Sequence, residues 1–458
     1  LNILLTNGRF PVSIDLARQF TRAGHAVYVV DPMHYHVCRF SNSVRKSWWV
    51  PTPHVDGRGY VEGVLRAMEE GIGGSGRIDL VVPMHEEIFY LAEAYTSDSD
   101  PPPLNSTSLS ALRTRLLAPP FPTLIMLHNK HTFSLFLRSL RLDHPLFRLI
   151  PSKSHLLPLL DGTSALHPTN PRASFALKPV FGRACSNVYH LHPLPATPSH
   201  EKANQKCLDE IDITPDNHYL AQEWVEGERF CTYAVVRGGR VLALGVYPVR
   251  DTIDGSSCVY FEAVENPRVK AYVERIVEGL GDVGGLGWQM ALDIVVEAGP
   301  GGRVMAIECN PRATSGIHLF SGTARLAEAI ASCVNQSRDQ TTSISTPPSP
   351  PPPSPPPTEN SIITPSPRHR RQLAPGMLMW KPATAGSSPR NKLSLVPRIR
   401  QYTSHMARLM GCKDVMFSAS DLLPSLMQPF LLTSYYEICR ERGMKLPEMF
   451  QWDLTWEP

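Results

Sequence analysis

The sequence predicts an α/β protein built from two successive regions: a Rossmann-like parallel α/β domain at residues 1–115 and an α+β domain at residues 116–336. Two patterns carry this prediction. In the first region, short apolar runs alternate with helical patterns, and in the second, several apolar runs are joined in pairs by glycine-containing turns. At 458 residues, the chain is long enough for two or three domains that each bury a core.

The first region opens as strand, helix, strand. An apolar run at residues 3–6 precedes a helical pattern at residues 12–23, which Gly24 ends as a C-terminal glycine does. A second apolar run at residues 26–31 completes a right-handed parallel unit. Residues 78–83 predict a later strand of the same sheet, with a helix after it.

The second region predicts a helix that begins near Lys130 and strands at residues 174–179 and 218–224. Two hairpins complete the region, and glycine pairs or triplets mark their turns. Their strands are residues 230–236 with 241–247 and residues 289–296 with 303–308.

Residues 337–374 break these patterns. The tract 346–357 is almost entirely proline and serine and cannot bury a core, so we expect an extended or disordered linker or insert, or an artefact of the gene model. Residues 375–458 predict a mostly helical C-terminal segment in which packing explains the apolar residues.

Bulk composition narrows the class of protein. A net charge of +3 with 19% charged residues gives no electrostatic reason to expect a nucleic-acid partner. No apolar run reaches the ~18 residues of a membrane span, so we expect no membrane partner. Nine cysteines without a C-x-x-C pair are typical of a reducing compartment and argue against a zinc site, which predicts a cytoplasmic protein.

The stretch from Ile307 to Arg312 carries the clearest chemical signal. Glu308 and Asn310 are two residues apart on a predicted strand, so both point to one face and can offer oxygens to one hard cation. Pro311 ends the strand, and Arg312 follows as a fixed positive charge. Two oxygen ligands and an arginine suit Mg²⁺ and a transferring phosphoryl group. A polar turn with a surface ion pair explains the hexapeptide equally well when it is taken alone.

Asp293 interrupts an apolar strand, which is costly unless the carboxylate is paired or binds a metal. If this strand pairs with the one that contains Glu308, the two acids become cross-strand neighbours. Adjacent carboxylates repel each other unless a divalent cation lies between them, so the pattern favours a metal site made by Asp293, Glu308 and Asn310.

Two lysines suit a bound phosphate. Lys130 opens a helix, where the backbone already favours anions, and Lys178 lies in an apolar strand followed by Gly182 and a loop of small and polar residues. Lysines are common at helix starts, and a strand lysine can extend to water, so each has a structural alternative.

The segment Gln222 to Glu228 predicts an extended hinge whose backbone groups can face an adenine ring, with acidic side chains beside it. An acidic surface turn is the alternative. Arg250, which follows the second strand of the first hairpin, is a further candidate for binding a substrate carboxylate, and His318 is expected to hydrogen-bond locally.

Along the chain, the five motifs occur in the order Lys130, Lys178 with its loop, the hinge at residues 222–228, Asp293 and the stretch 307–312. In that order they resemble the ATP-grasp superfamily, of the carbamoyl-phosphate synthetase and carboxylate–amine ligase type, over about residues 120–335. The resemblance implies ATP and Mg²⁺ (or Mn²⁺) as cofactors and gives each motif a role. The phosphates would be held by Lys130, Lys178 and Gly182, and the phosphoryl group would be acted on by Lys178 and Arg312. The adenine slot would be lined by Glu223, Trp224 and Val225, with Glu228 near the ribose. The metal would be held by Asp293, Glu308 and Asn310.

The resemblance implies an ATP-dependent ligase that joins a small-molecule carboxylate to an amine or similar nucleophile. Two departures from the family pattern stand out: the loop after Lys178 has one glycine, and Arg229 occupies the position where the family often has the ribose-binding acid. A non-catalytic ATP-binding scaffold is the main alternative. A nicotinamide-dependent oxidoreductase is disfavoured because the first turn, residues 7–13, lacks the glycine fingerprint. Neither substrate nor the oligomeric state can be read from the sequence.

Overall fold

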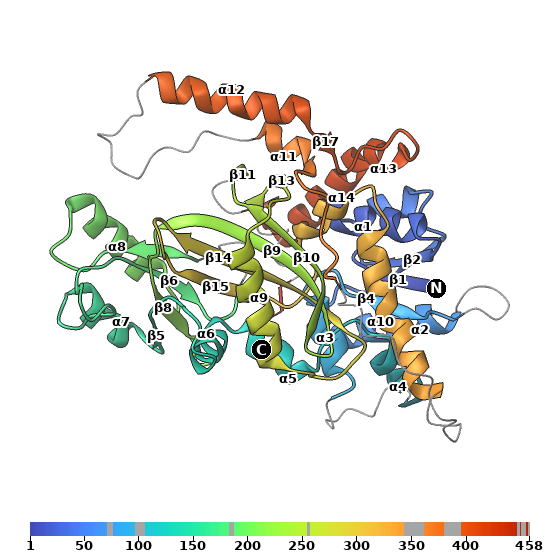
Figure 1. The fold of residues 1–458 in the computed structure, drawn as a ribbon, viewed down its shortest axis with the longest axis horizontal. Helices are drawn as coiled ribbons and strands as arrows, with labels where there is room; N and C mark the ends of the chain where they lie inside the picture. Colours follow the sequence, from blue (N-terminus) through green and yellow to red (C-terminus); the bar gives the residue numbers. More distant parts are fainter. Residues whose placement is uncertain are drawn as a thin grey trace.

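Figure 1 shows the fold of the chain, a computed structural model. The first domain lies at one side of the molecule, a small sheet with its neighbouring helices lies at the other, and a larger sheet lies between them. The structure describes residues 1–70, 77–96, 106–182, 187–253, 257–342, 361–379, 395–446, 449 and 455–456. The Pro/Ser-rich tract 346–357 and residues 183–186 of the predicted phosphate loop are outside these ranges.

The first domain is a four-stranded parallel sheet in the order β3-β2-β1-β4, which confirms the predicted parallel unit. Edge strand β3 has no counterpart in the sequence analysis, because it is only four residues long and just its second half, Trp48 and Trp49, is apolar. The elements are β1 (Asn2–Thr6), α1 (Pro11–Arg22), β2 (Ala26–Asp31), the 3-10 turn η1 (Val37–Phe40), β3 (Lys46–Trp49), α2 (Gly57–Glu70), β4 (Leu80–Val82), α3 (Glu87–Glu93) and α4 (Ser106–Arg115).

The next region forms a small antiparallel sheet in the order β5-β8-β6-β7. Helix α6 begins at Lys130, as predicted, because the Asn129 side chain accepts hydrogen bonds from the backbone N–H groups of His131 and Thr132 and so caps the helix. The elements are α5 (Phe121–His128), α6 (Lys130–Ser139), β5 (Phe147–Ile150), α7 (Lys153–Leu160), β6 (Phe175–Pro179), β7 (Tyr189–Leu191), α8 (Pro198–Glu210) and β8 (Tyr219–Glu223).

The larger sheet is antiparallel, in the order β10-β9-β14-β15, and consists of the two predicted hairpins joined through β9 and β14. Its register aligns one residue from each strand in a row: Tyr247, Cys231, Asp293 and Glu308. The elements are β9 (Gly227–Arg237), β10 (Arg240–Pro248), α9 (Pro267–Leu280), β14 (Trp288–Glu297), β15 (Val304–Asn310), η2 (Ser315–Phe320) and α10 (Arg325–Thr342).

The segment predicted as a linker is partly structured. Helix α10 extends to Thr342, and strand β16 pairs with β13 in a three-stranded sheet completed by β17. A three-residue strand between basic residues has too little apolar pattern to be recognised in the sequence. The remaining elements are β11 (Thr252–Ile253), β12 (Ser257–Cys258), β13 (Tyr260–Glu262), β16 (Arg370–Gln372), α11 (Ala374–Leu378), α12 (Leu395–Gly411), β17 (Lys413–Asp414), α13 (Leu423–Leu426) and α14 (Gln428–Arg442).

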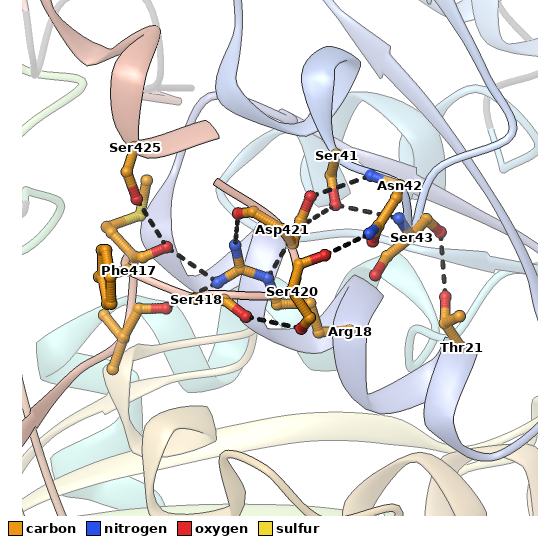
Figure 2. Close-up of polar contacts among 12 residues, drawn as sticks. Arg18, Thr21, Ser41, Asn42, Ser43, Phe417, Ser418, Ser420, Asp421 and Ser425 are labelled. Carbon is orange, nitrogen blue, oxygen red and sulfur yellow. Dashed lines mark hydrogen bonds and ion pairs between the residues drawn. The ribbon is translucent and has the colours of Figure 1, made fainter. Parts of the chain in front are cut away.

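Charged side chains fasten the C-terminal segment to the rest of the molecule. Arg18 on α1 donates to the Asp421 carboxylate, with 2.9 Å between Nε and Oδ2, and to the backbone carbonyls of Val415 and Met416 (Figure 2). Asp421 also accepts from Ser41 and from the backbone N–H of Asn42. Because Asp421 is only 6% exposed, these bonds form a buried polar contact between two distant parts of the chain.

Two further features bear on the sequence predictions. The eight cysteines in the described ranges are all free thiols. Among the helices that the structure describes, none combines the length and the apolar character that crossing a membrane requires.

Candidate active site

The two acids singled out in the sequence are direct cross-strand partners. Asp293 on β14 lies opposite Glu308 on β15, as predicted, and a register shift follows at Ile294. The Cys231 thiol, from the neighbouring strand β9, donates to Asp293, with 3.0 Å between Sγ and Oδ1. The hairpin thus places two carboxylates side by side on one face of the sheet.

Asn310 and Arg312 extend this acidic pair. The Asn310 amide donates to Glu308 over 3.3 Å and accepts from the Arg312 guanidinium over 3.1 Å. Strand β15 ends at Asn310, directly before Pro311, as expected for a residue without an N–H group. Glu308, Asn310 and Arg312 therefore form one continuous line of side chains at the end of β15.

Both predicted lysines approach from the smaller sheet and from α6, and both are nearly buried, at 6% exposed for Lys130 and 5% for Lys178. Lys178 Nζ lies 2.9 Å from the backbone carbonyl oxygen of Ile307, so it connects β6 with β15. Lys130 Nζ lies 2.9 Å from the carbonyl oxygen of Gly182. The smaller sheet and α6 therefore bring two ammonium groups close to the Glu308 carboxylate of the larger sheet.

The electrostatics of the acidic pair reflect this arrangement. Burial favours a protonated Glu308, but the positive charges of Lys130 and Lys178 outweigh it and lower the pKa of Glu308 to about 2. Burial, followed by the negative charge of Glu308, raises the pKa of Asp293 to about 7. A further positive charge beside the pair would let both carboxylates ionise together.

Gly182 requires the conformational freedom of glycine, because its φ of 142° is strained for other residues. Its carbonyl accepts from the Lys130 side chain, and the carbonyl of Val180 accepts from the Lys130 backbone N–H over 3.0 Å. Residues 180–182 therefore hold Lys130 at two atoms.

The hinge residue Glu223 uses its side chain for structure. Its carboxylate accepts from the backbone N–H of Leu146 over 2.9 Å and from the Arg303 guanidinium over 3.0 Å. Arg303 also pairs with Glu297, so Glu223 fastens the hinge to the β14–β15 hairpin. The backbone N–H of Trp224 donates to the carbonyl of Ser174 over 3.2 Å, so the Trp224 carbonyl and the backbone of Val225 are the candidates for facing an adenine ring.

The other hinge side chains lie toward solvent or pack outside. Trp224 is 43% exposed, and its ring stacks on His190 with centroids 3.7 Å apart. Glu228 is exposed on β9, opposite Val296. Gly227 has no room for a side chain, because a Cβ there would collide with the backbone carbonyl of Val296. The hinge glycine therefore has a packing requirement.

The sequence analysis missed Glu86, which reaches the site from the first domain. Glu86 is 1% exposed and pairs with Arg312, with 3.4 Å between Oε1 and Nη2. It lies after β4, at the carboxyl end of a parallel strand, where open α/β sheets bind ligands. That position could have identified Glu86, since the strand at residues 78–83 was predicted. His128, beside Lys130, was also overlooked, and burial lowers its pKa to about 4.

Two secondary candidates have other partners. Arg250 forms an ion pair with Glu262, which also binds Arg370, so its guanidinium stabilises the β13–β16 region. His318 Nδ1 lies 2.7 Å from Asp15 Oδ2 on α1, so its hydrogen bond is to a residue 303 positions away and not to a sequence neighbour.

The donor set suits a hard cation. Within the described ranges, no group of three or more histidine, cysteine, aspartate or glutamate side chains could hold a metal ion. Asp293, Glu308 and Asn310 are instead two carboxylates and an amide, and Mg²⁺ commonly takes only one or two carboxylates and completes its octahedron with water and phosphate oxygens. The like charges of the pair provide the reason for a cation to bind there.

No protein-family model and no curated protein matches the chain. Solved structures do. N5-carboxyaminoimidazole ribonucleotide synthetase in complex with ADP is 14% identical, with a TM-score of 0.50, and the match covers 72% of this chain and 77% of that chain. Biotin carboxylase from Campylobacter jejuni, with an ATP analogue, is 12% identical at a TM-score of 0.50, over 72% of this chain and 70% of that one.

A third match is the biotin carboxylase domain of the Hydrogenobacter thermophilus 2-oxoglutarate carboxylase, with MgADP, ADP and bicarbonate. It is 11% identical at a TM-score of 0.50, over 72% of this chain and 69% of that chain. All three are ATP-grasp enzymes. At these identities they establish the fold: the chain has the ATP-grasp fold preceded by a parallel α/β domain, as predicted.

Proposed function

We propose that the protein is an ATP-dependent ligase that activates a small-molecule carboxylate as an acyl-phosphate for attack by an amine or a similar nucleophile. The observation that carries this proposal is the convergence of Lys130, from α6, and Lys178, from β6, on the paired Asp293 and Glu308 of the larger sheet. The three matched structures are ATP-grasp enzymes, and two are described with ADP or MgADP, which supports the nucleotide assignment.

The residues divide the work by charge. Lys130 and Lys178 neutralise phosphate oxygens, and Asp293, Glu308 and Asn310 would hold Mg²⁺, which would offset the negative charge of the phosphates. The Arg312 guanidinium, kept in place by Glu86 and Asn310, stabilises the phosphoryl group as it moves. Each of these groups is positioned before substrate arrives.

Two steps complete the proposed reaction. A carboxylate oxygen of the substrate attacks the γ-phosphorus, the bond from that phosphorus to the β–γ bridging oxygen breaks, and ADP leaves. The amine then attacks the acyl carbon, inorganic phosphate leaves, and the amine loses a proton to solvent. The protein contributes positioning and charge neutralisation in both steps, with no covalent enzyme intermediate.

The test is an ADP-release screen of the purified protein over paired carboxylates and amines, repeated with Glu308→Ala. We expect one substrate pair to stimulate ADP release and the variant to abolish it while its circular dichroism stays unchanged. Calorimetric titration with ATP and Mg²⁺ separates this proposal from a non-catalytic scaffold. Unchanged ATP turnover in Glu308→Ala would refute the assignment.

A further inference from the structure

Trp456, far from the ATP-grasp motifs in the sequence, is buried between α3 of the first domain and the segments that contain Phe121 and Phe181. It is 6% exposed, and its ring stacks on Phe89 of α3 with centroids 4.8 Å apart and an interplanar angle of 20°. Its edges meet Phe121 at the start of α5 and Phe181 after β6, at 6.0 and 5.9 Å between centroids. One side chain thus contacts the first domain and the phosphate-binding region together.

The backbone of Trp456 reaches the same place. Its N–H donates to Glu86 over 3.0 Å at Oε2, while the other oxygen of Glu86 accepts from Arg312. Both carboxylate oxygens of Glu86 therefore accept a hydrogen bond, one from the backbone of Trp456 and one from Arg312, the proposed catalytic arginine. A displaced Trp456 would leave Glu86 less firmly held and would let the Arg312 guanidinium shift.

The contact between the rings of Trp456 and Phe181 also affects Lys130. Phe181 lies between Val180, whose carbonyl accepts from the Lys130 backbone, and Gly182, whose carbonyl accepts from the Lys130 side chain. Phe181 also packs against His128, at 5.8 Å between centroids. Holding the Phe181 ring therefore holds the short segment that sets the direction of the Lys130 ammonium group.

We infer that Trp456 is a positioning residue for the proposed ATP site: it fixes Glu86, and through it Arg312, together with residues 180–182, and through them Lys130. Trp456 contacts Glu86, Phe89, Phe121 and Phe181, and it acts through them on the groups that would contact ATP. This role rests on the proposed function, because it assigns an effect to groups that the proposal places around ATP.

The test measures Mg-ATP affinity by calorimetry in the wild-type chain of residues 1–458 and in the variants Trp456→Ala, Trp456→Phe and, as the control, Phe20→Ala. Phe20, on α1, is a fully buried aromatic residue in a core cluster that does not include Phe89, Phe181 or Trp456. We expect Trp456→Ala to weaken Mg-ATP binding about tenfold or more, Trp456→Phe to recover most of the loss because a ring still packs on Phe89, and Phe20→Ala to bind as wild type does.

Hydrogen exchange of the ligand-free proteins gives an independent readout, which also serves if Trp456→Ala does not fold. Trp456→Phe is expected to exchange faster than wild type in peptides that cover residues 121–137 and 175–182, and Phe20→Ala is expected to leave those peptides unchanged. Wild-type affinity in Trp456→Ala, equal weakening in Phe20→Ala, or unchanged exchange in Trp456→Phe would each overturn the inference. A wild type that binds no Mg-ATP would refute the proposed function and leave exchange to decide the role of Trp456.

Discussion

The two ends of the candidate site are built in different ways. At the phosphate end, four charged side chains converge, and they come from α6, β6, β14 and β15. At the hinge, Glu223 is committed to Leu146 and Arg303, and Trp224 stacks on His190 at the surface. Side chains would therefore bind the ligand at the phosphate end, whereas backbone groups would bind it at the hinge. The hinge side chains instead stabilise the conformation of the hinge.

Asp293→Asn tests the phosphate end and should have the largest effect. It removes one of two adjacent carboxylates, so we expect Mg-ATP affinity to fall by about 100-fold, at the upper end of losses for residues that support a metal site. ATP affinity in the presence of a chelator should change little. Calorimetry with and without Mg²⁺ measures both, and Glu226→Gln, an exposed hinge acid, is the matched control. An equal loss in the control would contradict the assignment.

Lys178→Met removes a nearly buried positive charge while keeping most of the side-chain length. We expect nucleotide affinity to fall by about 10- to 100-fold, which corresponds to the about 1.5–3 kcal/mol of a hydrogen bond to a charged group. Unlike the effect of Asp293→Asn, this loss should persist without Mg²⁺. Lys206→Met, at an exposed i,i+4 pair on α8, is the control and should bind nucleotide normally.

Arg303→Ala tests the hinge. Arg303 is partly exposed and pairs with Glu223 and Glu297, so its loss should loosen the hinge without removing a contact to nucleotide. We expect affinity to fall by about twofold to fivefold, in line with the modest worth of exposed ion pairs, and by the same factor with and without Mg²⁺. Arg240→Ala, in an exposed hairpin turn, is the comparison variant. A loss confined to Mg-ATP would show that the two ends are not separable.

The smallest expected effect concerns the His190 ring behind the hinge. Burial, followed by the charges of His192 and His200, lowers the pKa of His190 from 6.5 to about 4. Between these values the unfolded chain binds a proton that the folded chain does not, so the free energy of unfolding decreases as pH falls from 6.5 toward 4. Urea midpoints at pH 7 and pH 5 measure this decrease, and it should shrink in His190→Phe. An undiminished decrease in the variant would assign the effect to other groups.

Much of the fold could be predicted because its strongest signals are local. The parallel unit of the first domain and the two hairpins of the large sheet follow from apolar period and glycine turns. Strand β3 and strand β16 could not be predicted, since each is only three or four residues long, begins with a basic residue and depends on a partner strand for its conformation. Both strands form only because they pair with a strand from elsewhere in the chain, and no local sequence pattern shows that pairing.

The candidate site divides in the same way. The pairing of Asp293 with Glu308 follows once the hairpin is recognised, because register then fixes the partners. The contacts of Glu86 and Trp456 join residues 370 positions apart in the sequence, so only the folded chain brings them together. The role of the Glu223 carboxylate is likewise invisible in sequence, since Arg303 reaches it from another hairpin.

The bond between Arg18 and Asp421 has a consequence for biosynthesis, because it joins positions 403 residues apart. At about 5–20 residues per second, a ribosome needs about 20–80 s to make the intervening chain. Throughout that interval the nascent first domain presents an unmatched guanidinium and an uncovered surface on α1. Chaperones that shield such surfaces, or a coexpressed fragment that carries residues 413–442, should therefore improve the yield of truncated N-terminal pieces.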